Sequence, residues 1–481
     1  MSNSNGAKPR MDVTSAQQPL DTASQEQAAL FKTFIVTVRH FFGGFKRLFQ
    51  DVSDPRHAAY LTYPLPAVMT TGVLMFLLRL GARRQVSHLL RGNGPSAVKY
   101  RILFDVENCP HGDTLNYLCV RSNVAEVQEV VTAMTETLIR RKVLYHHRLL
   151  DRYFLVVIDG TGMLTFSERH CPHCMTRTSH GHTLYYHPVL EAKLVTPMGF
   201  AFSLLTEFIE NPGENPTKQD CELKAFYRLA KRLKQRFPRL PICLLLDGLF
   251  AGGPTFAICD KYYWKYLIVL QEDDLPFVNQ EFKALSQLVP TNHLVFHTGI
   301  QSEIRQDLRW VNKIAYLDSR QQEHNVSVIE CLETKPDADQ QIKTTRFKWI
   351  TNFNVTAHKV VALANEGGRL RWKIENEGFN VQKNGGYALE HVYSQHANAG
   401  KIFYLLLQMA HLLFQLIEHG SLFRHAFPKG VGSAKNIAFR LLEAWRNLHL
   451  RLDDVRRIDQ TLPRFSGQRA KRRDCAVIFP L

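Results

Sequence analysis

Apolar residues recur at helical spacing through the first third of the chain. Steps of three and four residues separate the members of two runs: Phe31, Phe34, Ile35 and Val38, and later Val124, Val127, Val131 and Met134. This spacing is typical of amphipathic helices. Because Lys and Arg are interleaved with it, the pattern between about 30 and 150 predicts a helical unit with a positively charged face.

The pattern changes at Tyr153, where a continuous apolar run leads into Asp159-Gly160. A run of this length and composition predicts a strand buried on both faces. The run 242–246, followed by Asp247-Gly248, predicts a second such strand. Strands are also expected at 187–195, 199–208 and 266–270, and helices at 217–237 and 253–263. Strands and helices that alternate in this way indicate an α/β fold.

Between about 290 and 350 the pattern becomes that of antiparallel strands, at 313–317, 325–332 and 344–350. It predicts a small β unit inserted into the α/β body. Trp264, Trp310 and Trp349 lie in or near this unit, where core packing is favoured over stacking on a DNA base. Helical patterning returns at 356–377 and dominates the last hundred residues.

The charge balance indicates a polyanionic partner. The chain has 60 Lys and Arg against 44 Asp and Glu, a net charge of +16, and such an excess attracts nucleic acid. The nine cysteines are an odd number and no signal-peptide pattern precedes them, which favours a reducing cytoplasm. The apolar stretches 65–78 and 402–417 fall short of the roughly 20 clean residues of a membrane span, so we expect buried helices and no membrane partner.

Asp159 and Asp247 each follow a buried apolar run, and each precedes a glycine that lets another group approach closely. Open α/β sheets bind ligands at strand ends. A pair of carboxylates suits Mg²⁺, and a third carboxylate allows two ions to be held. The alternative is that both Asp-Gly pairs are ordinary turn residues.

The segment 371–380, Arg-Trp-Lys-Ile-Glu-Asn-Glu-Gly-Phe-Asn, resembles the Glu-bearing signature of DDE transposases from bacterial insertion sequences. The resemblance extends to Asp54-Pro55-Arg56, to 217–222 and to 383–387. It implies a ribonuclease-H-like catalytic core with an inserted antiparallel β unit. It also implies that Asp159, Asp247 and Glu375 are the catalytic residues and hold two Mg²⁺ or Mn²⁺ ions.

The same resemblance assigns DNA contacts to Arg371 and Lys383. The family's signature places Tyr three residues before the Arg and Lys seven after the Glu, where this chain has Gly368 and Gln382. Arg371 lies four residues before Glu375, so on a regular helix the two share a face. They could also form a solvated ion pair without function. Glu377 is an alternative third carboxylate.

Composition, apolar pattern and the resemblance together predict four parts along the chain: a disordered tail (1–28), a helical N-terminal DNA-binding domain (29–150), the catalytic domain (151–400, with the β insertion at about 272–352) and a helical C-terminal region (401–481) ending in a basic tail at 469–473.

The implied activity is metal-dependent cleavage of transposon ends and strand transfer into target DNA. Its partners are terminal inverted repeats, target DNA and a second copy of the chain when paired ends are bound, in the nucleoid region of a bacterial cytoplasm. No nucleotide-binding motif occurs, and transesterification needs no ATP. Two alternatives remain open: a transposase-derived DNA-binding protein that no longer cuts, and a metal-dependent nuclease that does not rejoin.

A second metal site is suggested by Cys171-Pro172-His173-Cys174, which has the Cys-x₂-Cys spacing of structural Zn²⁺ sites. We take His180 and His182 as the completing ligands; His170 and His187 also flank the motif. The competing interpretation is a hydrophilic turn without metal.

Overall fold

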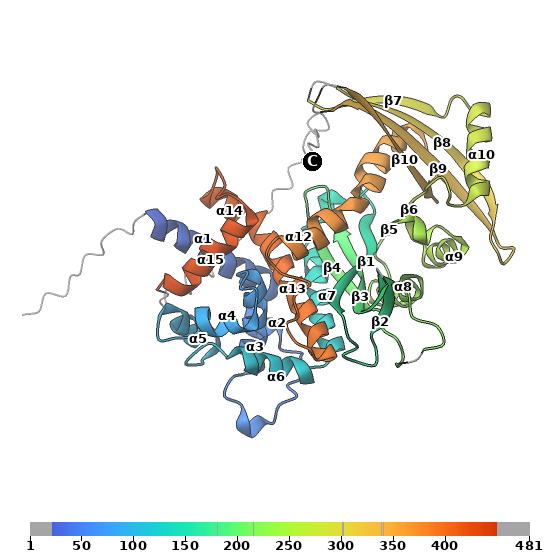
Figure 1. Cartoon of the computed structure of the whole chain (residues 1–481). Helices are drawn as coiled ribbons and strands as arrows, with labels where there is room; N and C mark the ends of the chain where they lie inside the picture. Colours follow the sequence, from blue (N-terminus) through green and yellow to red (C-terminus); the bar gives the residue numbers. More distant parts are fainter. Residues whose placement is uncertain are drawn as a thin grey trace, which may run out of the picture.

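The computed structural model describes residues 22–179, 181–214, 216–300, 303–337, 339 and 341–449. A group of helices from both ends of the described chain lies beside a large twisted sheet, and α13 runs between them (Figure 1). At the far side of the sheet, long antiparallel strands extend away from the helices (Figure 1).

The N-terminal unit is helical, as the apolar spacing predicts. Its helices are α1 (Thr22–Phe42), α2 (Phe45–Leu48), α3 (Leu65–Leu77), α4 (Arg83–Leu90), α5 (Pro95–Phe104), α6 (Gly112–Arg121) and α7 (Val124–Arg140), with short 3₁₀ turns η1 (Ala58–Tyr60) and η2 (Tyr145–His147). Helix α1 begins inside the segment expected to be a disordered tail, because α1 packs on α15 (Ala434–Asn447). Glu26 pairs with Arg440, and Phe31 lies against Trp445.

One mixed sheet of ten strands forms the centre of the molecule, so the α/β class is confirmed. The strands are β1 (Phe154–Phe166), β2 (Met175–Ser179), β3 (His182–Val195), β4 (Ala201–Phe208), β5 (Ile242–Leu246), β6 (Lys265–Val269), β7 (His293–Thr298), β8 (Ile304–Leu317), β9 (Glu323–Pro336) and β10 (Ile342–Thr351). Their order is β2-β3-β1-β5-β6-β10-β9-β8-β7, and β4 pairs with the other part of β3.

Strand β1 lies inside this sheet. It pairs antiparallel with β3 and parallel with β5, and β5 pairs parallel with β6. Alternate residues of β1 enter two different core clusters, Val156 and Ile158 on one face and Leu155 and Val157 on the other. The continuous apolar run therefore marks a strand buried on both faces, as predicted.

The connecting helices are α8 (Glu222–Arg236), the short η3 (Gly248–Phe250), α9 (Gly253–Tyr262) and α10 (Pro276–Leu288). Helices α8 and α9 follow the predicted alternation, whereas α10 lies within the range predicted for the β insertion. Helix α8 begins five residues later than predicted, because Gln219 and Asp220 hydrogen-bond outside the helix, to Thr176 and Asn211.

Strands β7 to β10 are antiparallel, as expected for this region, but β7 and the first part of β8 were not predicted. They are not a separate sheet, because β10 pairs with β6 and continues the central one. Trp264, Trp310 and Trp349 are buried, so core packing is the role that the structure supports for all three.

A distorted helical segment follows β10. It consists of α11 (Ala357–Ala362), the π-helical η4 (Leu363–Gly367), the 3₁₀ turn η5 (Gly368–Trp372), the π-helical η6 (Ile374–Phe379) and α12 (Asn380–Asn384). The sequence predicts a regular helix here. Gly368 packs so tightly against the Trp349 indole that an added Cβ would lie 2.4 Å from a ring carbon. Changes in helix type of this kind are frequent at functional sites.

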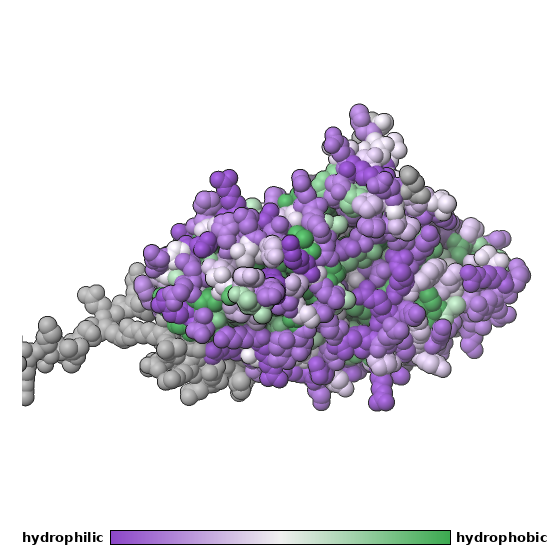
Figure 2. Space-filling view, turned by 90° about the horizontal axis from the view of Figure 1, so that it is seen from below, coloured by the Kyte–Doolittle hydropathy of each residue, from purple (hydrophilic) through white to green (hydrophobic). Residues whose placement is uncertain are grey.

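Helix α13 (Ala397–Glu418) is apolar and long enough to cross a membrane, but 94% of its most apolar window is buried inside the protein. Its polar residues are bonded in the interior: Gln408 accepts a hydrogen bond from Lys193, and Gln415 accepts one from the Ala201 amide. It is thus a core helix, as expected, and is followed by α14 (Ser421–Ala426) and α15. The basic tail 469–473 lies outside the described residues. On the face shown in Figure 2, hydrophilic residues dominate.

Candidate functional site

The register of the sheet brings Asp159 and Asp247 side by side. Val157 of β1 is the last residue of that strand paired with β5, and its partner is Leu245. Asp159 and Asp247 each lie two residues further along, on neighbouring strands about 5 Å apart. Asp247 directly follows β5, as predicted. Asp159 does not end its strand, because β1 continues to Phe166 in its pairing with β3.

Both aspartates are held by the amide that follows them. The Gly160 N–H donates to Asp159 Oδ1 at 2.9 Å, and the Gly248 N–H donates to Asp247 Oδ1 at 2.6 Å. An added Cβ at Gly160 would lie 2.2 Å from a carboxylate oxygen of Glu222, and one at Gly248 would lie 2.4 Å from an oxygen of Asp274. Each Asp-Gly pair is therefore a point of close approach by a further carboxylate.

Glu375 lies in η6, which packs on β1 and β4. Burial is the main reason that the pKa of Asp159 is raised, and the negative charges of Asp247 and Glu375 raise it further. The Arg371 guanidinium opposes these effects. The three carboxylates named by the family resemblance thus belong to one electrostatic cluster.

Glu222, the first residue of α8, is a fourth member of this cluster. Burial raises its pKa, and the charges of Asp159 and Asp247 add to the shift. The sequence places Glu222 within a segment shared with the family but gives it no role. A carboxylate at the first turn of a helix that follows a polar stretch has an ordinary capping explanation, so the sequence carried no stronger signal.

Arg371 is buried and pairs with Asp159, Nη1 to Oδ2 at 3.1 Å. The regular helix on which Arg371 and Glu375 would share a face is not present, because Arg371 lies in a 3₁₀ turn and Glu375 in a π-helical one, and the ion pair that Arg371 forms is with Asp159. The guanidinium also lies 4.4 Å from the ring centroid of Trp372, and its Nε is buried without a partner among the described residues.

Glu377 faces other groups. Lys373 Nζ lies 2.7 Å from its Oε1. Burial raises the pKa of Glu418 and lowers that of His419 at the end of α13; the charge of Glu377 adds to the first shift and opposes the second. The cluster around Asp159 includes Glu375, so the geometry favours Glu375 as the third carboxylate.

The two departures from the family signature have structural explanations. Gly368 leaves no room for the family's tyrosine because Trp349 packs against its backbone. Gln382 is fully buried and donates to Gln408 Oε1 at 2.9 Å, so this position faces the interior. Lys383, predicted as a DNA contact, pairs with Glu390 at 3.3 Å and remains partly exposed.

Cysteine and histidine side chains converge at a second place, the cysteine-histidine cluster of His170, Cys171, Cys174 and His187. Their ligand atoms all lie within 4.8 Å of one another, so the cluster could hold a metal ion. Among the described residues, no other group of three or more His, Cys, Asp or Glu side chains has its ligand atoms this close together. The carboxylates around Asp159 are therefore spaced more widely than the ligands of the cysteine-histidine cluster. Burial, and then the neighbouring His170, lower the pKa of His187 to about 4.

The predicted histidine ligands differ from these. His182 is exposed at the start of β3, outside the cluster, and His180 lies outside the described residues. The chain reaches His187 five residues later in the same strand, where the pairing of β3 with β1 and β2 brings it under the loop. Sequence spacing could not select it.

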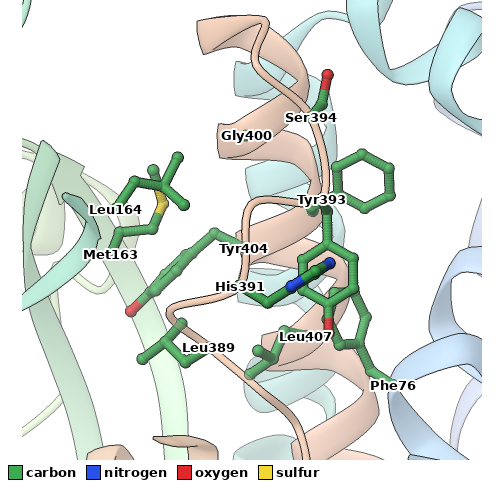
Figure 3. A pocket seen from close by; sticks show the side chains of 11 residues that line it. Phe76, Met163, Leu164, Leu389, His391, Tyr393, Ser394, Gly400, Tyr404 and Leu407 are labelled. Carbon is green, nitrogen blue, oxygen red and sulfur yellow. The ribbon is translucent and has the colours of Figure 1, made fainter. Parts of the chain in front are cut away.

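A mostly apolar pocket lies between β1 and α13, as Figure 3 shows. Met163 and Leu164 face Tyr404 and Leu407 across it, and none of the clustered carboxylates lines it. The pocket is therefore separate from the acidic site.

No protein-family model matches this chain, and no curated protein matches it. The interpretation of the site therefore depends on its own geometry and on the sequence signature.

Proposed function

We propose that this chain is a DDE transposase that cleaves transposon ends and joins them to target DNA. The single observation that carries the proposal is the acidic cluster: Asp159 and Asp247 lie at adjacent register positions of parallel strands, and Glu375 lies close enough to raise the pKa of Asp159. Clustered, partly buried carboxylates of this kind are typical of functional sites.

The strands around β1 support the proposed ribonuclease-H-like core. In this proposal β4, β3 and β1 form its antiparallel part, β5 and β6 add two parallel strands, and β7 to β10 form the insertion between Asp247 and Glu375. The insertion lies at the edge of the sheet, so it can contact DNA without displacing the core strands.

The residues present fit divalent cations such as Mg²⁺ or Mn²⁺, which prefer carboxylate oxygens. One ion would be held by Asp159 and Asp247, and a second by Asp159 and Glu375. Two ions in such sites lie about 4 Å apart, and each is bound by oxygens about 2 Å away. The carboxylate oxygens on opposite sides of the ion pair can therefore be roughly 8 Å apart, further than the ligands of a single ion. When bound, the ions would supply activation of the attacking oxygen and stabilisation of the leaving oxygen.

The other side chains have positioning roles in this proposal. Arg371 holds Asp159 in one orientation through its ion pair, and its buried side chain favours this role over the predicted DNA contact. Burial and the charges of Asp159 and Asp247 raise the pKa of Glu222, which favours a protonated carboxyl. In this proposal Glu222 orients the two aspartates or donates a proton to the substrate beside them. The net charge of +16 favours DNA as the partner.

The test is cleavage and strand transfer on DNA that carries the sequences flanking the gene of this protein, with Mg²⁺. Asp247→Ala should lose both reactions by about 10³-fold or more, as for other members of a catalytic unit. Asp273→Ala is the matched control, because Asp273 is an exposed aspartate after β6. Undiminished activity in Asp247→Ala would refute the proposal.

A non-cutting, transposase-derived DNA-binding protein is the second candidate function. The observations that favour it are the buried Gln382 in place of a lysine and the pairing of Lys383 with Glu390. Mg²⁺-independent binding of the flanking DNA without any cleavage by the wild-type chain would select this alternative. Cleavage without joined products would instead select a nuclease.

A further inference from the structure

The loop that carries the cysteine-histidine cluster has little hydrophobic reason to be ordered. Residues 167–174, between β1 and β2, read Ser-Glu-Arg-His-Cys-Pro-His-Cys and contain no Phe, Tyr, Trp or large aliphatic side chain. Yet Cys174 and His187 are almost fully buried. A polar loop with buried thiol and imidazole groups needs another source of stability, and a bound metal ion is the common one.

The distances between the ligand atoms fit a tetrahedral Zn²⁺ ion. Zn–S bonds of about 2.3 Å and Zn–N bonds of about 2.05 Å place ligand atoms about 3.8 Å apart for S–S pairs and 3.6 Å for S–N pairs. The two Sγ atoms lie 3.4 Å apart, and the S–N distances are 3.3 Å from Cys174 to His170, 3.4 Å from Cys171 to His187 and 3.6 Å from Cys174 to His187.

A disulfide does not explain the arrangement. The Sγ separation of 3.4 Å is well beyond the S–S bond length of about 2.05 Å. A disulfide would also not explain why the imidazoles of His170 and His187 lie within 3.6 Å of the sulfur atoms. Two thiolates with two imidazoles are the ligand set that favours Zn²⁺.

Hydrogen bonds join the cysteine loop to the chain that precedes α8. His173 Nδ1 lies 2.9 Å from the Asn211 carbonyl oxygen, and the Asn211 side-chain amide donates to the Cys174 carbonyl at 2.9 Å. The same amide donates to Gln219 Oε1 at 3.3 Å. Asn211 is buried, and its bond to the Cys174 carbonyl is buried with it.

The chain from Gln219 leads directly to the acidic cluster. Gln219 bonds both the amide and the carbonyl of Thr176, and Asn211 Oδ1 accepts from the Asp220 amide at 3.2 Å. Two residues later, Glu222 begins α8 with its carboxylate against Gly160. A continuous series of hydrogen bonds therefore connects the cysteine loop with the start of α8 and Glu222.

We propose that His170, Cys171, Cys174 and His187 bind one Zn²⁺ ion, and that this ion fixes Asn211 and the segment 219–222, which places Glu222 beside Asp159 and Asp247. The ion has a structural role. Four protein ligands complete its tetrahedron and leave no position for substrate. This inference does not depend on the proposed transposase activity.

The first measurement is metal content of the full chain after dialysis against a weak chelator. One Zn²⁺ per chain is expected, and His187→Ala and Cys174→Ser should lose it. His182→Ala is the matched control, because His182 is an exposed histidine in the same strand, and it should keep the ion. Replacement by Co²⁺ in the wild-type chain should give the intense visible bands of a tetrahedral thiolate site, which keeps the test valid even if the variants fail to fold.

Absence of zinc together with a Co²⁺ spectrum free of thiolate bands would overturn the site, as would a Cys171–Cys174 disulfide found by mass spectrometry. The second measurement is amide hydrogen exchange. His187→Ala should accelerate exchange at Asn211 and in 219–222 by at least about tenfold relative to His182→Ala, with α15 unchanged. If the wild-type chain binds zinc but amide exchange is identical in His187→Ala and His182→Ala, the coupling to Glu222 is overturned.

Discussion

The ion pair between Arg371 and Asp159 offers the sharpest test of how the acidic cluster is stabilised. Arg371→Met removes the charge and keeps most of the side-chain volume. The side chains are 7% and 23% exposed, and the charged atoms are 3.1 Å apart. At an effective dielectric constant of about 20, two unit charges at this distance attract by about 5 kcal/mol.

The measured cost should be smaller than this attraction, because the substitution also removes the cost of taking the Arg371 guanidinium out of water. Removing one partner of a buried pair typically costs about 3 to 5 kcal/mol, and the partial exposure of Asp159 places this pair near 3 kcal/mol. Arg371→Lys should cost less, since it keeps the charge but loses the planar donor fork. Arg320→Met is the control at an exposed arginine.

The assay is denaturant unfolding of the single variants and of Arg371→Met/Asp159→Asn. Asp159→Asn removes the carboxylate that Arg371 compensates, so Arg371→Met should cost less in the Asp159→Asn background than in the wild type. Mg²⁺ should stabilise Arg371→Met more than the wild type, because the carboxylates then lack their own cation. A loss equal to that of Arg320→Met, or strictly additive losses, would refute the reasoning.

Three further outcomes are expected. Because the pKa of Asp159 is raised, the stabilisation of the protein by Mg²⁺ should be lost on acidification at a higher pH than for an ordinary aspartate. Without metal, the protein should instead become more stable on acidification, because protonation of Asp159 relieves repulsion between the carboxylates. Thermal unfolding measured against pH with and without Mg²⁺ checks the direction of both effects. Glu375→Gln should reduce DNA cleavage by about 10³-fold or more whereas Glu377→Gln keeps most of it, and equal losses would contradict the assignment of the third carboxylate. Gly160→Ala should cost about 1 to 3 kcal/mol in unfolding, since the new Cβ meets Glu222, and adding Glu222→Ala should recover part of it; no recovery would show that the close approach is unimportant.

The strands and helices that local pattern determines could be predicted from the sequence. The apolar run before Asp159 marks a strand buried on both faces, and Val156 and Val157 do enter opposite core clusters. The apolar stretch of α13 is recognisable as a core helix because Gln408 and Gln415 interrupt it, and both are bonded in the interior.

The contacts between distant segments could not be predicted from local pattern. Periodicity assigns Arg371 to the face of Glu375 only if the helix is regular, and the tight contact of Gly368 with Trp349 accompanies a change of helix type. Spacing offers several histidines near the Cys-x₂-Cys motif, and only the register of β3 with β1 selects His187. Both outcomes depend on residues far apart in the sequence.

The central claim is that Asp159, Asp247 and Glu375 share divalent cations. The most direct measurement is anomalous diffraction from crystals of the full chain with Mn²⁺, with and without DNA that carries the sequences flanking its gene. The account predicts Mn²⁺ peaks bounded by these three carboxylates, at least when DNA is present. Density free of Mn²⁺ at this position in both crystals would contradict it.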